Sequence, residues 1–92
     1  MATVAKNVEA RRFEIEGSNG AAVLTYHEGK GHITLVHTAV APELGGRGYA
    51  GALAQAALEY ARAQGLRVVA HCPFVRTYLE RHPEYADLTA AR

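Results

Sequence analysis

The sequence is poor in cysteine and has no long apolar run. Cys72 is the single cysteine among 92 residues, which excludes an internal disulfide, and no group of Cys and His residues has the spacing of a structural zinc site. No apolar stretch approaches the roughly 20 residues that cross a bilayer, and the first residues lack the apolar core of a signal peptide. We therefore expect a single cytoplasmic domain over residues 1–92, stabilised by packing, with no metal and no membrane partner.

Net charge is also nearly absent. The formal charge is +1, whereas a nucleic-acid-binding chain usually carries a strongly basic face, so we expect no nucleic-acid partner. The arginines nevertheless gather in the second half of the chain, at Arg47, Arg62, Arg67, Arg76 and Arg81. This distribution favours a small polyanion as ligand, although solvated surface charges are the alternative for most of these side chains.

Strand patterns dominate the first half of the chain. Residues 12–16 alternate polar and apolar side chains, a glycine-containing turn follows, and residues 21–26 form a second strand pattern, which together predict a β-hairpin. Residues 32–40 are a long β-rich run with few polar interruptions. This run predicts a central strand that is covered on both faces.

Helix patterns dominate the second half. From Ala50 the apolar residues recur at helical spacing until Gly65, a residue that commonly ends a helix. Residues 67–71 then predict a short buried strand parallel to 32–40, because a helix of crossover length separates the two. Pro73 suits the start of a last helix, which Pro83 stops. The expected fold is α/β (α+β), with a mixed sheet and the order β-β-β-α-β-α.

A glycine-rich loop, residues 42–51, joins the long strand to the first helix. A helix start offers unpaired backbone N–H groups and about half a positive charge, and glycines let a phosphate approach the backbone closely. The spacing matches neither G-x-G-x-x-G nor the G-x-x-x-x-G-K-S/T phosphate loop. The loop therefore indicates either a phosphate cradle or a flexible turn that ends in a capping glycine.

The same loop resembles the pyrophosphate loop of the GNAT (GCN5-related) N-acetyltransferases, whose pattern is Q/R-x-x-G-x-G/A. The resembling residues are Gly45-Gly46-Arg47-Gly48-Tyr49-Ala50, in which Gly45 departs from the Gln or Arg of the pattern. Residues 37–40, 46–48, 72–75 and 78–85, taken in order, resemble the very small YjdJ-like GNAT subfamily. The resemblance covers about residues 12–88.

This resemblance implies a compact minimal GNAT fold that binds acetyl-coenzyme A (acetyl-CoA) across the splayed ends of two parallel strands. The pantetheine arm would pair with the backbone of Thr38, Ala39 and Val40. The pyrophosphate would lie on Gly45, Gly46, Arg47, Gly48, Tyr49 and Ala50. The last helix would border the groove through Tyr78 and Arg81, for which core packing and a solvated face are the respective alternatives. The small subfamily lacks the elements with which larger GNAT enzymes build an acceptor pocket, so the acceptor stays unnamed.

Cys72 and His37 are the candidate catalytic residues. The resemblance puts Cys72 near the thioester, as an acyl-accepting thiolate or as a small buried hydrophobe. His71 is a poor candidate base for it, because adjacent strand residues point to opposite faces. His37 lies near the end of the neighbouring strand, where it could accept a proton from an amine or thiol, and a core histidine is its alternative reading.

The expected activity is acetyl transfer from acetyl-CoA to a primary amine of a small molecule or protein. The transfer would proceed by base-assisted attack or through an acetyl-Cys72 intermediate. The alternative function is a non-catalytic acyl-CoA-binding module.

Overall fold

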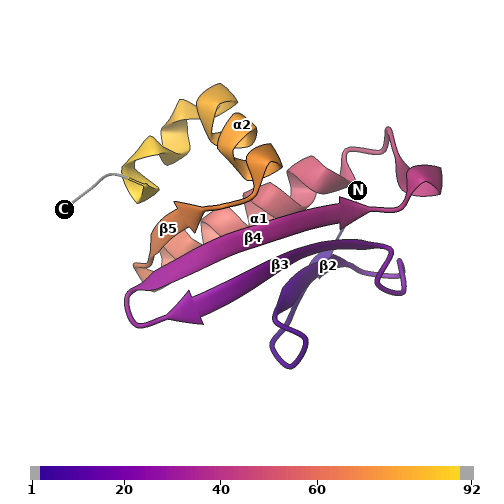
Figure 1. The fold of residues 1–92 in the computed structure, drawn as a ribbon, viewed down its shortest axis with the longest axis horizontal. Coiled ribbons are helices and arrows are strands. Elements are labelled where there is room, and N and C mark those ends of the chain that lie inside the picture. Colours follow the sequence, from indigo (N-terminus) through magenta and orange to yellow (C-terminus); the bar gives the residue numbers. More distant parts are fainter. Residues whose placement is uncertain (1–2, 90–92) are drawn as a thin grey trace.

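A computed structural model describes residues 3–89 and shows a five-stranded sheet with two α-helices packed against it (Figure 1). The strands are β1 (Val4–Asn7), β2 (Arg12–Ile15), β3 (Ala22–Gly29), β4 (His32–Val40) and β5 (Arg67–Ala70); the helices are α1 (Tyr49–Gln64) and α2 (Pro73–Arg81), with the 3-10 helices η1 (Pro42–Leu44) and η2 (Pro83–Leu88). The strands lie in chain order, with β1 to β4 antiparallel and β5 parallel to β4. The expected α+β fold with a mixed sheet is confirmed.

The strand β1 was not expected from the sequence. It adds an edge to the sheet by pairing antiparallel with β2, in a register that sets Val4 opposite Ile15 and Lys6 opposite Phe13. All four of its residues are half-buried, so it shows no alternation of apolar and polar side chains. The observed order is therefore β-β-β-β-α-β-α.

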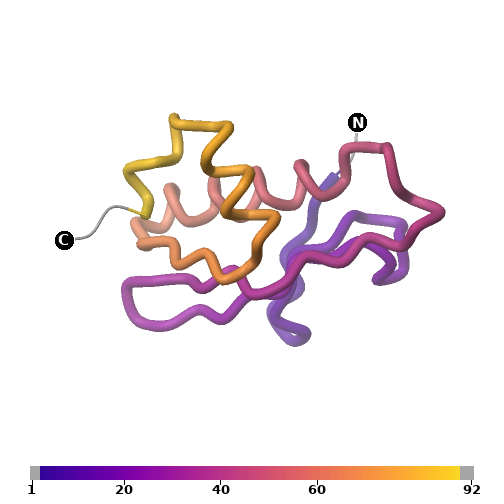
Figure 2. Tube along the Cα trace, turned by 45° about the horizontal axis from the view of Figure 1, so that its top comes forward, coloured from indigo at the N-terminus to yellow at the C-terminus, as the bar shows by residue number. Residues whose placement is uncertain are grey.

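The expectation that the long strand is covered on both faces is wrong. In β4, Ile33 and Leu35 are fully buried, whereas Val36, His37 and Ala39 are exposed. Both α-helices lie over the same side of the sheet, as the tube view shows (Figure 2). The other side of the sheet, which we call the open face, has no helix over it among residues 3–89.

A bulge in β4 separates its two halves. Thr25 of β3 pairs with His37 and Tyr26 pairs with Leu35, which leaves Val36 as the extra residue. Pairing with β5 extends only from His32 to Leu35, while β4 itself continues to Val40. Beyond the bulge the two parallel strands therefore diverge, and the chain leaves β5 for α2 (Figure 1).

The helix α1 supplies one side of the core. Its buried residues are Leu53, Ala54, Ala57, Leu58 and Ala61, which is the helical stripe that the sequence predicts. The small alanine side chains let the helix approach the sheet closely, and α1 contacts every strand. It begins after Gly48 and ends before Gly65, both of which have left-handed backbone angles.

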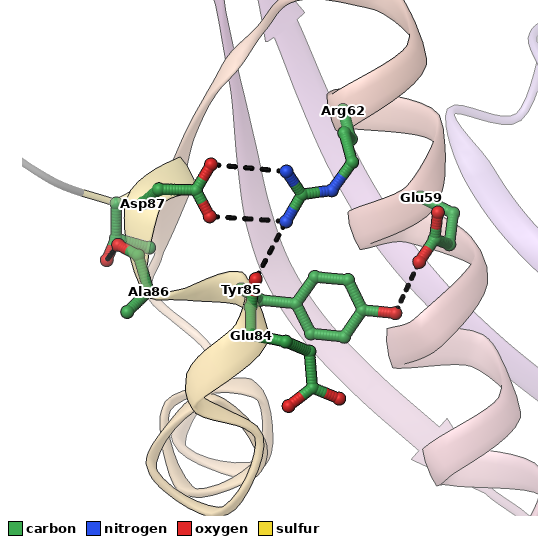
Figure 3. Close-up of polar contacts among 7 residues, drawn as sticks. Glu59, Arg62, Glu84, Tyr85, Ala86 and Asp87 are labelled. Atoms are coloured by element: carbon green, nitrogen blue, oxygen red, sulfur yellow. Dashed lines mark hydrogen bonds and ion pairs between the residues drawn. The ribbon is translucent and has the colours of Figure 1, made fainter.

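The 3-10 helix η2 is held against α1 by a polar cluster that the sequence did not reveal (Figure 3). The Arg62 guanidinium donates to both carboxylate oxygens of Asp87 and to the Glu84 carbonyl. The buried Tyr85 donates its hydroxyl to the Glu59 carboxylate. These contacts hold η2 against the C-terminal turns of α1.

Candidate active site

The glycine-rich loop bends sharply before α1. Gly46 and Gly48 have φ values of 79° and 76°, a region that favours glycine because side chains rarely adopt it. A Cβ atom at either position would meet nothing within 4 Å, so the space above the loop is open. A hollow of about 350 Å³ lies there, lined by Val40, Leu44, Gly45, Gly46, Gly48, Tyr49, Ala50, Gly51 and Phe74.

The first turn of α1 points free hydrogen-bond donors at this hollow. The first backbone bond of the helix runs from Ala52 N–H to the Gly48 carbonyl, so the N–H groups of Tyr49, Ala50 and Gly51 have no partner within the helix. No side chain caps this end of α1, and its first turn carries no acidic residue. These N–H groups and the positive end of the helix dipole favour an anion.

Where β4 and β5 diverge, β4 presents unpaired backbone groups to the cleft between them. The Ala41 N–H donates to the carbonyl of Ala21, the residue before β3. Hydrogen-bonded and non-hydrogen-bonded pairs alternate along antiparallel strands. The N–H and C=O groups of Thr38 and Val40 therefore point away from β3, into the cleft. Ala39 pairs with Val23 and turns its backbone groups to β3, so of the three expected residues only two offer backbone groups to a ligand in the cleft.

The thiol of Cys72 lies beside this edge. Cys72 immediately precedes α2 and is only 2% exposed, and its Sγ is 3.2 Å from the Thr38 hydroxyl oxygen. Burial raises the pKa of the thiol. Hydrogen bonds from the Thr38 hydroxyl and from the backbone N–H groups of Val75, Phe74 and Thr38 lower the pKa by more than burial raises it, so the pKa lies below its usual value. The thiolate, which is the nucleophilic form of cysteine, is therefore easier to form here than in an ordinary cysteine.

The structure does not bring His37 and Cys72 together. Thr38 pairs with the fully buried Leu24, whereas His37 pairs with the half-buried Thr25 and is exposed. Successive side chains of a strand alternate between faces, so the His37 imidazole lies on the open face while Cys72 lies on the helix side. The environment that lowers the thiol pKa is therefore made by neutral donors and not by His37.

The helix α2 brings aromatic side chains to the rim of the hollow. Phe74 lines it directly and is 38% exposed. The ring of Tyr78 stacks on that of His82 with centroids 3.9 Å apart, and its Cε2 lies 3.8 Å from the Cβ that a side chain at Gly51 would carry. Burial, followed by the charges of Glu84 and Glu59, raises the pKa of Tyr78, which keeps its hydroxyl a hydrogen-bond donor.

The two candidate arginines, Arg47 in the loop and Arg81 at the end of α2, are both exposed. A larger hollow of about 630 Å³ lies elsewhere, along β5 and α2, where it is lined by Arg67, Val68, Val69, Ala70, Arg76, Leu79, Glu80 and Thr89. It contains none of the candidate catalytic or cofactor-binding residues, although Arg67 and Arg76 belong to the arginines of the second half of the chain. We place the candidate site at the smaller hollow because the residues with free backbone donors line it, as does Val40, which is two residues along β4 from the Thr38 that contacts the thiol.

Residues 3–89 contain neither a metal-binding cluster nor a membrane-spanning helix. No three His, Cys, Asp or Glu side chains in that range are grouped as a metal ion would require. No helix within it is both long and apolar enough to span a membrane.

A family model, that of the GCN5-related N-acetyl-transferases, matches residues 12–88. The chain belongs to this family. The fold agrees, because the chain is similar to the NMR solution structure of a GCN5-like protein from Staphylococcus aureus, with 31% sequence identity and a TM-score of 0.72. The alignment covers 94% of this chain and 85% of the other. A comparison with curated proteins finds no significant match.

This GCN5-related N-acetyltransferase contains two site features that sequence reasoning missed. The Thr38 side chain was not expected to touch Cys72, because the two residues are 34 positions apart and the contact depends on how β4 and β5 diverge. Phe74 was not singled out as a lining residue, although it follows Cys72 and Pro73 in the segment that carried the resemblance. The signal that could have identified it is an aromatic residue in the first turn of a helix that borders the loop.

Proposed function

We propose that this acetyltransferase takes its acetyl group from acetyl-CoA and transfers it to a primary amine of a small molecule or protein. One observation carries the proposal: a single unpaired strand edge leads from the thiol to the glycine loop. Thr38 contacts Cys72 at one end of that edge, and Val40 lines the hollow above the loop at the other. A long ligand with an anion at one end and a thioester at the other suits this path.

In this proposal the pyrophosphate lies on the loop residues Gly45 to Ala50, where backbone N–H groups and the helix dipole favour it. The carbonyl of Thr38, whose N–H acts on Cys72, and the backbone groups of Val40 pair with the amides of the pantetheine arm. Arg47 and Arg81 add positive charge around the phosphates, and Tyr78 borders the groove. No metal is needed, since the donors that bind the anion belong to the backbone.

The proposed chemistry has two steps. The Cys72 thiolate attacks the acetyl carbonyl of acetyl-CoA, a C–S bond to Cys72 forms, and the bond to the CoA sulfur breaks, releasing the CoA thiolate. The amine then attacks acetyl-Cys72, an amide forms, and the Cys72 thiolate leaves while the amine loses a proton to solvent or to a base. In the alternative the amine attacks acetyl-CoA directly, and His37 on the open face accepts its proton.

The test is incubation of the purified protein with acetyl-CoA, followed by intact-mass measurement and peptide mapping. We expect one added acetyl group, located on Cys72, and CoA release that continues only when a primary amine is supplied. A panel of amines, from polyamines to lysine peptides, identifies the acceptor class. Binding of acetyl-CoA with no adduct and no CoA release under any amine would show the non-catalytic binding module instead.

The unpaired cysteine also bears on the compartment. A thiol that must stay reduced to act as nucleophile works best where glutathione and thioredoxin keep thiols reduced. We therefore propose the cytoplasm as the site of action. Fractionation of cells that express the tagged protein tests this.

A further inference from the structure

We propose that the Thr38 hydroxyl is a positioning residue for Cys72, which holds the sulfur at the end of the β4–β5 cleft and donates a hydrogen bond to the thiolate. The observation is the 3.2 Å contact between Thr38 Oγ1 and Cys72 Sγ, on the helix side of the sheet. The inference deepens the proposed function, on which its consequences for catalysis rest. The hydrogen bond itself can be tested without any acetyl transfer.

The direction of this hydrogen bond changes with the protonation state of the sulfur. A thiol can donate to the Thr38 oxygen, whereas a thiolate can only accept, so ionisation of Cys72 requires the hydroxyl to donate. A hydrogen bond to an ionised acceptor is roughly twice as strong as a neutral one. The threonine therefore stabilises the thiolate more than the thiol.

Thr38 is suited to this task by its place in the fold. Its backbone N–H is turned into the cleft and also lowers the pKa of Cys72, together with the N–H groups of Phe74 and Val75 in the first turn of α2. Three of these four donors belong to the backbone and persist in any variant. The hydroxyl is the single donor that a side-chain substitution removes.

No charged group offers an alternative cause. Several titratable side chains lie on the segments around the thiol, namely on β4, β5, α2, η2 and the residues that join them: His32, His37, Arg67, His71, Arg76, Tyr78, Glu80, Arg81, His82, Glu84, Tyr85 and Asp87. Within residues 3–89 none of these forms a hydrogen bond with Cys72, and the groups that shift its pKa are all neutral. A change at Thr38 should therefore be read directly in the titration of the thiol.

The same hydrogen bond would act in both chemical steps. In the first it holds the thiolate in place for attack on the thioester. In the second it stabilises Cys72 as the leaving group, because the sulfur regains its negative charge as the amine takes the acetyl group. The hydroxyl exchanges no proton with substrate in either step.

The experiment labels Cys72 with 13C at Cβ, which gives one resonance since the chain has a single cysteine, and follows its shift with pH. In Thr38→Val, which keeps the branched shape and removes the hydroxyl, we expect the apparent pKa of the thiol to rise by about one unit. Thr38→Ser restores the donor and should restore the wild-type value. Thr34→Val removes the other threonine hydroxyl of β4, on the open face, and should change nothing.

An unchanged titration in a folded Thr38→Val protein, or a rise in Thr38→Ser as large as in Thr38→Val, would overturn the inference. If Thr38→Val does not fold, Thr38→Ala supplies the same comparison without a branched side chain. Acetylation of Cys72 by acetyl-CoA gives the second readout: at neutral pH we expect about a tenfold slower rate in Thr38→Val, with the difference shrinking as pH rises past the thiol pKa. If the wild type takes no acetyl group but the titrations differ as expected, the proposed function fails while the hydrogen bond stands.

Discussion

At the scale of single residues, the site depends on one thiol that is nearly inaccessible yet surrounded by donors. Burial alone would raise the pKa of Cys72 and make it inert, as it does for most buried cysteines. Four neutral donors outweigh that effect. The position before α2 supplies two of them, because the N–H groups in the first turn of a helix have no partner within it.

The Cys72→Ala substitution tests the role of the thiol. We expect the variant to bind acetyl-CoA within about twofold of the wild-type Kd, because backbone groups hold the cofactor, and to lose transfer by several orders of magnitude. Calorimetry measures the binding and CoA release measures the turnover. Cys72→Ser is the matched control, since it keeps a hydrogen-bonding atom but has a much weaker nucleophile. Full activity in both variants would favour direct attack with His37 or water as the base.

Arg47 tests how much of the binding is simple charge. Its side chain is exposed, so its interaction with phosphate is screened by salt, while the backbone donors of the loop persist. We expect Arg47→Ala to weaken acetyl-CoA binding about fivefold or less and to flatten the dependence of Kd on salt. Arg67→Ala, an exposed arginine on β5, is the control and should leave the salt dependence as it is. Equal salt slopes for wild type and Arg47→Ala would mean that Arg47 does not act on the phosphates.

At the scale of elements, the glycine before α1 has two roles: it allows the left-handed backbone that starts the helix, and it leaves space for a ligand at the loop. Gly48 needs a left-handed backbone and borders the hollow at the loop. Gly65, at the other end of the same helix, needs the same backbone and lies outside that hollow. Alanine costs about 1–2 kcal/mol in such a conformation. Both Gly48→Ala and Gly65→Ala should therefore lose similar stability in a thermal melt.

The two variants should differ in binding. We expect Gly48→Ala to weaken acetyl-CoA binding about tenfold or more, because the added methyl group occupies the space that the phosphates approach, and Gly65→Ala to bind like wild type. Calorimetry on both proteins gives the comparison. Equal affinities would remove the loop from the binding site whatever the stability data show.

The elements also explain where sequence reasoning succeeded and where it stopped. The alanine and leucine stripe of α1 has one periodicity from end to end, so the helix could be predicted almost to the residue. In β4 the bulge at Val36 restarts the alternation of side chains. Apolar residues are therefore found at both odd and even positions along β4. In sequence, this strand covered on one face resembles a strand covered on both faces. The contact of Thr38 with Cys72 depends on the same bulge and could not be predicted from spacing.

At the scale of the whole molecule, the chain closes its core with very few residues. The sheet is covered by helices on one side only, and η2 completes that layer through Tyr85 and Leu88, both buried. Tyr85 contributes to both the core and the polar cluster: its ring packs in the core, and its hydroxyl donates to the Glu59 carboxylate (Figure 3). The stability of the whole domain should therefore respond to the ionisation of this one group.

The response should appear at alkaline pH. The hydrogen bond to the Glu59 carboxylate, with burial and the charge of Glu59 acting in the same direction, raises the pKa of Tyr85 from 10.0 to about 12. A group whose folded pKa is raised stabilises the protein fully below its unfolded pKa, and that contribution is lost as pH climbs from about 10 to about 12. At 1.36 kcal/mol for each pKa unit, the change from 10.0 to about 12 corresponds to a loss of up to about 3 kcal/mol. Urea unfolding of wild type and Tyr85→Phe across this range checks it: the variant should be less stable at neutral pH and lose less stability between pH 10 and 12. Parallel curves for the two proteins would show that Tyr85 ionises no later in the folded chain than in the unfolded one, and that η2 is held by Arg62 and packing alone.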